Sequence, residues 1–152
     1  MDTEKQDDDI VIQITRNFKD IDLSLPGLKK LVTAICNRFR LSGATVSIAI
    51  VDSAEIRKVN KKFLGSNHTT DCLSFDLSDN DAARTFELVV NGEKAVKEAA
   101  LQGHSGQAEM ALYITHALLH NLGFDDSTQE QAEKMHQTEN DILEQLGYGL
   151  VY

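Results

Sequence analysis

Hydrophobic and polar residues alternate over residues 10–15, where Ile10, Ile12 and Ile14 fall on one side. Successive side chains of a strand point to opposite faces, so this period of two predicts a half-buried β-strand. Short apolar runs bounded by polar residues predict three more strands. They cover residues 44–51, 72–77 and 86–90. The sequence therefore predicts a sheet of about four strands.

Apolar residues at helical spacing predict five helices. The first covers residues 28–39 behind Pro26, a residue that favours the first turn of a helix, and Gly43 ends the segment. Asp52 and Glu55 resemble a capping box that starts the second. The remaining three are expected over residues 94–101, 107–122 and 128–146. We expect an α+β fold in which these helices pack on a small mixed sheet.

The length and composition favour one domain. The 152 residues suit a single domain over residues 10–152, preceded by a disordered tail over residues 1–9, five of which are acidic. The start lacks a signal peptide's basic and apolar regions, and no apolar run approaches the roughly 20 residues that span a bilayer. We therefore expect a cytoplasmic protein without a membrane partner. Cys36 and Cys72 show no metal or redox spacing and are expected to be reduced core residues.

The net charge of −9 opposes loose adhesion to nucleic acid or to an anionic membrane. A polyanion would have to meet a local basic patch. The only basic clusters are Arg38 with Arg40, and the group Arg57, Lys58, Lys61 and Lys62. The alternative is that both clusters are solvated helix faces, as charge runs usually are.

Candidate chemistry gathers in residues 115–126, THALLHNLGFDD. His116 and His120 are four residues apart on a predicted helix, so both imidazoles leave the same face. Gly123 can adopt the left-handed conformation that stops a helix, after which Asp126 can return toward the histidines. Three protein ligands with an open position are typical of a catalytic zinc site. We predict one divalent ion, zinc first among the candidates, bound by His116, His120 and Asp126.

Other interpretations of these residues stay open. Buried histidines are often held by carbonyls or carboxylates without a metal. Asp126 also has a rival role, because it would make a helix cap with Gln129, whereas Ser127 with Glu130 would make the cap and leave Asp126 available. The residue after His116 is Ala117, so the general base of HExxH peptidases is missing. An ion that activates water would still support hydrolysis of an ester or phosphodiester.

Residues 115–126, together with TTDCLSFDL at residues 69–77, resemble the YbeY family of bacterial rRNA-maturation endoribonucleases. Later positions of the family pattern match Met135, Glu139 and Leu143, with Asn60 ahead of the first motif. The resemblance implies a compact α+β fold that binds one metal, usually zinc, through three histidines. It implies metal-dependent cleavage of single-stranded RNA in 3′-end maturation of small-subunit rRNA and in ribosome quality control. The small ribosomal subunit is the implied partner.

This chain departs from the family pattern at several positions. Asp126 stands where the family has histidine, and Leu64 stands where it has an arginine thought to help catalysis. Lys61 and Lys62 would partly replace that arginine as substrate-binding residues, without its bidentate fork. Phe86 begins a pair that replaces the family's Gly-Asp. Two alternative functions therefore remain: a ribosome-associated RNA-binding factor with weak or lost nuclease activity, and a metallohydrolase of another ester or phosphoester.

Overall fold

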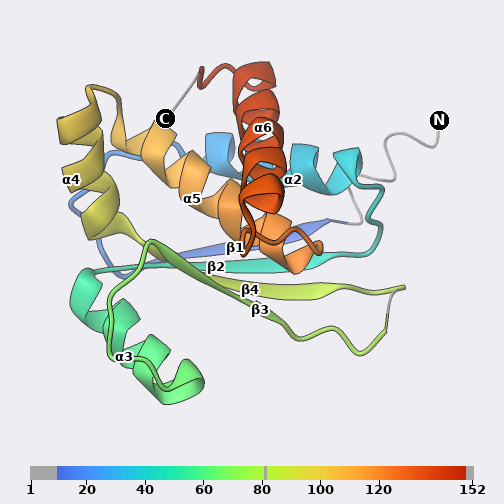
Figure 1. The fold of residues 1–152 in the computed structure, drawn as a ribbon, viewed down its shortest axis with the longest axis horizontal. Coiled ribbons are helices and arrows are strands. Elements are labelled where there is room, and N and C mark those ends of the chain that lie inside the picture. Colours follow the sequence, from blue (N-terminus) through green and yellow to red (C-terminus); the bar gives the residue numbers. More distant parts are fainter. Residues whose placement is uncertain (1–9, 81, 150–152) are drawn as a thin grey trace.

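A four-stranded sheet forms the middle layer of the molecule (Figure 1). The computed structural model describes residues 10–80 and 82–149. The strand order is β1-β2-β4-β3, with β1, β2 and β4 parallel and β3 antiparallel at the edge. The strands are β1 (Val11–Arg16), β2 (Thr45–Val51), β3 (Cys72–Asp76) and β4 (Thr85–Asn91). The α+β fold with a small mixed sheet is confirmed.

Helices cover the two faces of the sheet unequally (Figure 1). One face carries α2 (Leu25–Arg38) and α5 (Gly106–Asn121) against the strands, with α4 (Gly92–Gln102) and α6 (Gln129–Gln145) packed on α5. The opposite face carries α3 (Ser53–Leu64). The first helix ends at Arg38, before the expected stop at Gly43, where the backbone instead turns toward β2 with a φ of 66°.

The main hydrophobic core lies between the sheet and α5. Alternate residues of the central strands point into it and are almost completely buried: Val46, Ile48 and Ile50 from β2, and Phe86, Leu88 and Val90 from β4. A smaller apolar cluster lies under α3, around Ile56 and Val89. The face of the sheet toward α5 is thus buried at its centre. The opposite face is buried only under α3 and leaves Glu87 of β4 exposed.

The remaining sequence predictions concern the N-terminal tail, membrane-spanning helices and the two cysteines. The predicted acidic tail at residues 1–9 lies outside the described residues. Within the described residues, every helix is too short or too polar to cross a membrane. Cys36 is a buried free thiol, as predicted, whereas Cys72 is also free but only partly buried.

Candidate metal centre

The two histidines lie on the helix that the core surrounds. The hydroxyl of Ser105 caps α5 by accepting from the backbone N–H of Ala108 at 3.1 Å. The helix ends at Asn121. Most of its residues are buried, yet the side chains of His116 and His120 keep 29% and 32% exposure. A helix fixed in a core therefore presents both imidazoles at its last turns, where solvent reaches them.

Three donor atoms converge at this end of α5. His116 Nε2 and His120 Nε2 lie 3.2 Å apart. Asp126 Oδ2 lies 3.7 Å from His116 Nε2 and 3.8 Å from His120 Nε2. One potential ligand atom from each residue lies within 4.8 Å of the others, which makes this group a candidate metal site. The structure thus brings together all three residues that the sequence nominated.

The connection between α5 and α6 explains why Asp126 faces the histidines. Gly123 adopts a φ of 99°, a left-handed conformation that favours glycine, and reverses the chain. Asp125 then accepts from the Asp126 backbone N–H at 2.8 Å and from the Ser127 hydroxyl at 2.6 Å. This local bonding occupies Asp125 and leaves the carboxylate of Asp126 turned toward the rings.

Both predicted caps for the last helix are wrong. Thr128 caps α6: its hydroxyl accepts from the Gln131 N–H at 3.1 Å, and the Gln131 side chain accepts from the Thr128 N–H at 3.2 Å. The cap falls one residue later than Ser127, whose hydroxyl bonds Asp125 instead. Asp126 therefore has no capping role.

A buried glutamate on α6 completes the site. Glu139 Oε2 lies 2.5 Å from His116 Nδ1, and the Glu139 side chain is fully buried. Its other oxygen, Oε1, has no hydrogen-bond partner. Burial by itself lowers the pKa of His116, but the hydrogen bond and charge of Glu139, with the charges of Asp126 and Asp71, outweigh it and raise the pKa above its ordinary value.

Sequence reasoning matched Glu139 to a family pattern but gave it no role. The sequence did contain a signal for a role of Glu139, because this glutamate lies between Met135 and Leu143 on the buried face of α6. Carboxylates are seldom fully buried without a partner. A glutamate in an apolar stripe therefore indicates a basic or protonated group opposite.

The arrangement fits a divalent metal ion. Tetrahedral zinc with bonds of about 2.0–2.1 Å places its donor atoms about 3.3–3.4 Å apart. The observed separations of 3.2, 3.7 and 3.8 Å approach this triangle, and the Asp126 side chain, 42% exposed, has room to close the longer two. Metal-bound histidines commonly donate their second N–H to a carboxylate, as His116 does to Glu139. Two imidazoles and a carboxylate suit zinc, and also iron, cobalt or manganese.

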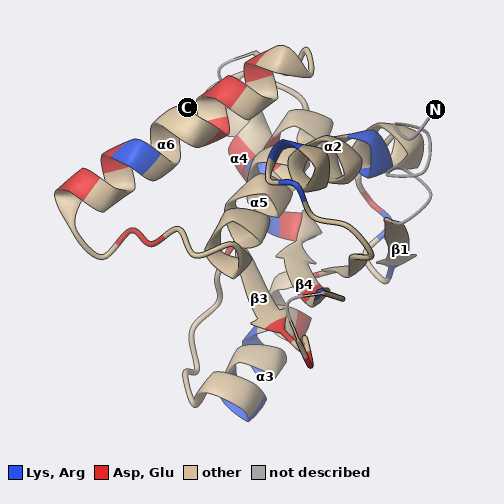
Figure 2. Ribbon diagram, turned by 90° about the vertical axis from the view of Figure 1, so that its right-hand side faces the viewer, with Lys and Arg blue, Asp and Glu red and all other residues tan. Residues whose placement is uncertain are grey.

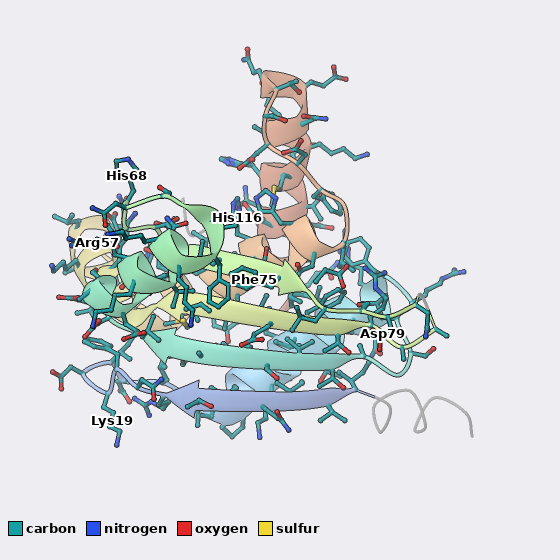
Figure 3. The ribbon with its side chains drawn as sticks, turned by 90° about the horizontal axis from the view of Figure 1, so that it is seen from below. Lys19, Arg57, His68, Phe75, Asp79 and His116 are labelled. Atoms are coloured by element: carbon teal, nitrogen blue, oxygen red, sulfur yellow. The ribbon has the colours of Figure 1, made fainter. Side chains whose placement is uncertain are left out.

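The predicted substrate-binding lysines lie elsewhere. Lys61 and Lys62 are exposed in the last turn of α3, on the opposite face of the sheet from α5 (Figure 2). Lys62 Nζ lies 5.3 Å from the ring centroid of Phe63. Figure 3 is viewed from the α3 side, and the labelled His116 lies beside α6, where it pairs with Glu139. Among the contacts of the described residues, none joins either lysine to the candidate ligands, so their role stays a prediction.

Known proteins are similar to this chain in sequence and in fold. The model of the family described as "Endoribonuclease YbeY" matches residues 13–147. An endoribonuclease YbeY of Caldanaerobacter subterraneus is 36% identical over 116 residues, 67% of this chain and 73% of the relative. An endoribonuclease YbeY of Bacillus licheniformis is 31% identical, over 69% of this chain and 73% of the relative. The solution structure of TM1509 from Thermotoga maritima shares the fold, with a TM-score of 0.58 and 22% identity over 89% of this chain and 91% of that one.

Proposed function

Because this chain belongs to the endoribonuclease YbeY family, we propose that it is a metal-dependent endoribonuclease that cuts single-stranded RNA. Its role is 3′-end maturation of small-subunit rRNA and ribosome quality control in the cytoplasm, with the small ribosomal subunit as partner. The observation that carries the proposal is the convergence of His116, His120 and Asp126 at the end of α5. These residues would hold the ion, zinc being the first candidate.

Each residue of the site has a distinct part in this mechanism. His116, His120 and Asp126 would hold the ion, which when bound would lower the pKa of a water molecule and act as a Lewis acid toward the phosphoryl oxygen. Glu139 accepts from His116 Nδ1, so the lone pair of Nε2 faces the two other ligands. Because α5 is embedded in the core, its histidines need little rearrangement to bind. Lys61 and Lys62 would attract the RNA backbone from α3.

Removing either histidine tests the mechanism directly. We expect the purified, metal-loaded protein to cut single-stranded RNA, and His116→Ala and His120→Ala to abolish cutting. His68→Ala is the matched control, because the side chain of His68 is exposed and its backbone carbonyl, which the substitution keeps, is the atom that accepts from Asn60. Undiminished cutting by both ligand variants would rule the mechanism out.

A second experiment tests the lysines separately. Exposed lysines contribute mainly to encounter with a polyanion, so the double variant Lys61→Ala/Lys62→Ala should raise KM, more at low salt than at high salt, with kcat little changed. Lys30→Ala on α2 removes an exposed lysine from the other face of the sheet and is the control. An unchanged KM for the double variant would exclude these lysines from RNA binding.

Two substitutions favour a second candidate, an RNA-binding factor with weak or lost nuclease activity. Leu64 is 60% exposed at the end of α3 and offers no donor to a phosphate, and Asp126 replaces a family histidine. Co-sedimentation with small ribosomal subunits, without turnover of any RNA by metal-loaded protein, would favour this candidate. Metal-dependent turnover of small esters without RNA binding would instead indicate a hydrolase of another ester or phosphoester.

A further inference from the structure

One face of α5 carries a stripe of functional side chains that extends well beyond the candidate ligands. Glu109, Tyr113, His116 and His120 follow one another at intervals of four, three and four residues, which places them on a single face. Glu109 and Tyr113 are each only 4% exposed. Glu109 Oε1 lies 2.5 Å from His104 Nε2, so its buried carboxylate has a partner. The stripe leads along the helix toward the candidate metal centre.

Two adjoining cavities follow this stripe. The smaller, of about 160 Å³, has His116 in its wall. The larger, of about 460 Å³, reaches Lys94 on α4. Asp71, Leu112 and Tyr113 line both, so the cavities meet. We call them together the α5 groove. The larger part has the size of an ordinary small-molecule site, and the smaller part opens beside a candidate ligand.

The side chains of the α5 groove favour a polar ring over a phosphate. Asp71, Glu98 and Glu109 bring three carboxylates, against the single ammonium group of Lys94. Lys94 Nζ pairs with Asp71 Oδ1, and both side chains keep more than a third of their exposure, which leaves polar atoms available to a ligand. The pair therefore presents an acceptor and a donor side by side, while Leu112 supplies an apolar wall.

We propose that the α5 groove binds the base of a nucleotide next to the scissile phosphate and prefers cytosine or adenine to uracil. Both preferred bases carry an amino group beside a ring nitrogen that accepts hydrogen bonds. The amino group would donate to Asp71, and the ring nitrogen would accept from Lys94. Uracil has no amino group, and its only donor on this edge is N3–H, which lies between two carbonyl oxygens. If N3–H donates to Asp71 while one carbonyl oxygen accepts from Lys94, the other carbonyl oxygen is left beside the carboxylate, which disfavours uracil. Proteins commonly recognise unpaired RNA bases through hydrogen bonds to the Watson–Crick edge, where this amino group and ring nitrogen lie.

This inference rests on the proposed function, because it assumes RNA at the metal centre. It also gives a role to Asp71, which belongs to the segment at residues 69–77 but not to the candidate ligands. Asp71 acts here as a specificity-determining residue, in addition to the charge that it places near His116.

The test measures binding without cleavage. The full chain carrying His120→Ala, which leaves the groove walls intact, is titrated with fluorescently labelled homopolymeric RNAs of cytidine, adenosine and uridine. We expect the cytidine and adenosine RNAs to bind about tenfold more tightly than the uridine RNA, the scale of one good base contact. Adding Asp71→Ala should bring this ratio close to one. Asp79→Ala, which removes an exposed carboxylate after β3, should leave the ratio unchanged.

Each outcome decides between the two proposals. Equal affinities for the three RNAs, or a ratio that survives Asp71→Ala, would overturn the inference. Asp71→Asn keeps the shape of the side chain and serves as a second variant in case Asp71→Ala misfolds. Its amide can also donate to uracil, so the ratio of affinities should fall in this variant too. If wild-type protein cuts RNA without any base preference, only the base site fails. If the preference is present and wild-type protein cuts no RNA, only the proposed nuclease activity fails.

Discussion

Replacing Glu139 should weaken metal binding by an amount that depends on what the new side chain keeps. The carboxylate is fully buried and lies 2.5 Å from His116 Nδ1. Losing such a partner of a metal-bound histidine typically costs about 10–100-fold in affinity, which corresponds to about 1.4–2.8 kcal/mol. Glu139→Gln keeps an acceptor for the Nδ1 proton but loses the charge, so we expect a loss near tenfold. Glu139→Ala loses both and should approach a hundredfold.

The assay is competition for zinc between protein stripped of metal and a chromogenic chelator at fixed pH. Glu144→Gln is the matched control, because Glu144 lies on the same helix and is exposed. Circular dichroism melts of the metal-free variants show whether they remain folded, and affinities are compared only between variants that do. Zinc affinity equal to wild type in folded Glu139→Gln and Glu139→Ala would refute the role that we assign to Glu139.

Three further predictions test the environment of the site and the packing of the fold. Because the pKa of His116 is raised in the folded state, its protonation stabilises the metal-free protein fully below the ordinary pKa of about 6.5, and this stability is lost as pH rises through the raised pKa. Urea unfolding in the presence of a chelator should show this loss of stability with rising pH. Glu139→Gln should make the unfolding free energy depend less on pH. Burial raises the pKa of Cys72 to about 12. At about pH 8, iodoacetamide should therefore label this thiol roughly a thousandfold more slowly than it labels a peptide thiol, with labelling followed by mass spectrometry. Comparable labelling rates would contradict this prediction. In Gly92→Ala the added Cβ would lie 2.8 Å from Phe18 Cδ2, and we expect urea unfolding to show a loss of about 1–3 kcal/mol, whereas wild-type stability would refute the close packing.

The strands could be predicted because their pattern is local. The alternation of Val46, Ile48 and Ile50 follows directly from one buried face of β2. The strand order could not be predicted in this way, because it depends on pairs far apart in the chain. Thr45 pairs with Thr85, for example, and β3 turns antiparallel to β4 at the edge of the sheet. No local pattern encodes such pairings.

The candidate site shows the same limit. His116, His120 and Asp126 lie within one helix and its following turn, so their spacing was enough to bring them together. The contact between Glu139 and His116 spans 23 residues and required α6 to pack back on α5. The helix cap failed for a different reason. Ser127 and Thr128 can both cap a helix, so residue type alone does not decide between them. In the structure Thr128 is the cap, and the Ser127 hydroxyl donates to Asp125.

The lysines illustrate what a helical pattern leaves undetermined. Lys61 and Lys62 follow from the sequence as exposed residues at the end of a helix, and the structure agrees. Which face of the sheet that helix covers depends on how the chain crosses over, and α3 packs on the face away from α5 (Figure 1). The helical pattern therefore could not place these lysines relative to the histidines.

The placement of Asp126 on the α5–α6 connection has a consequence for proteolysis. Two of the three donors belong to a rigid helix, whereas the third lies in an exposed connection. A bound ion would cross-link that connection to the helix and oppose the local opening on which a protease depends. Nicking between Gly123 and Thr128 should therefore slow when zinc is added, and cleavage at this point would report the occupancy of the site without any RNA.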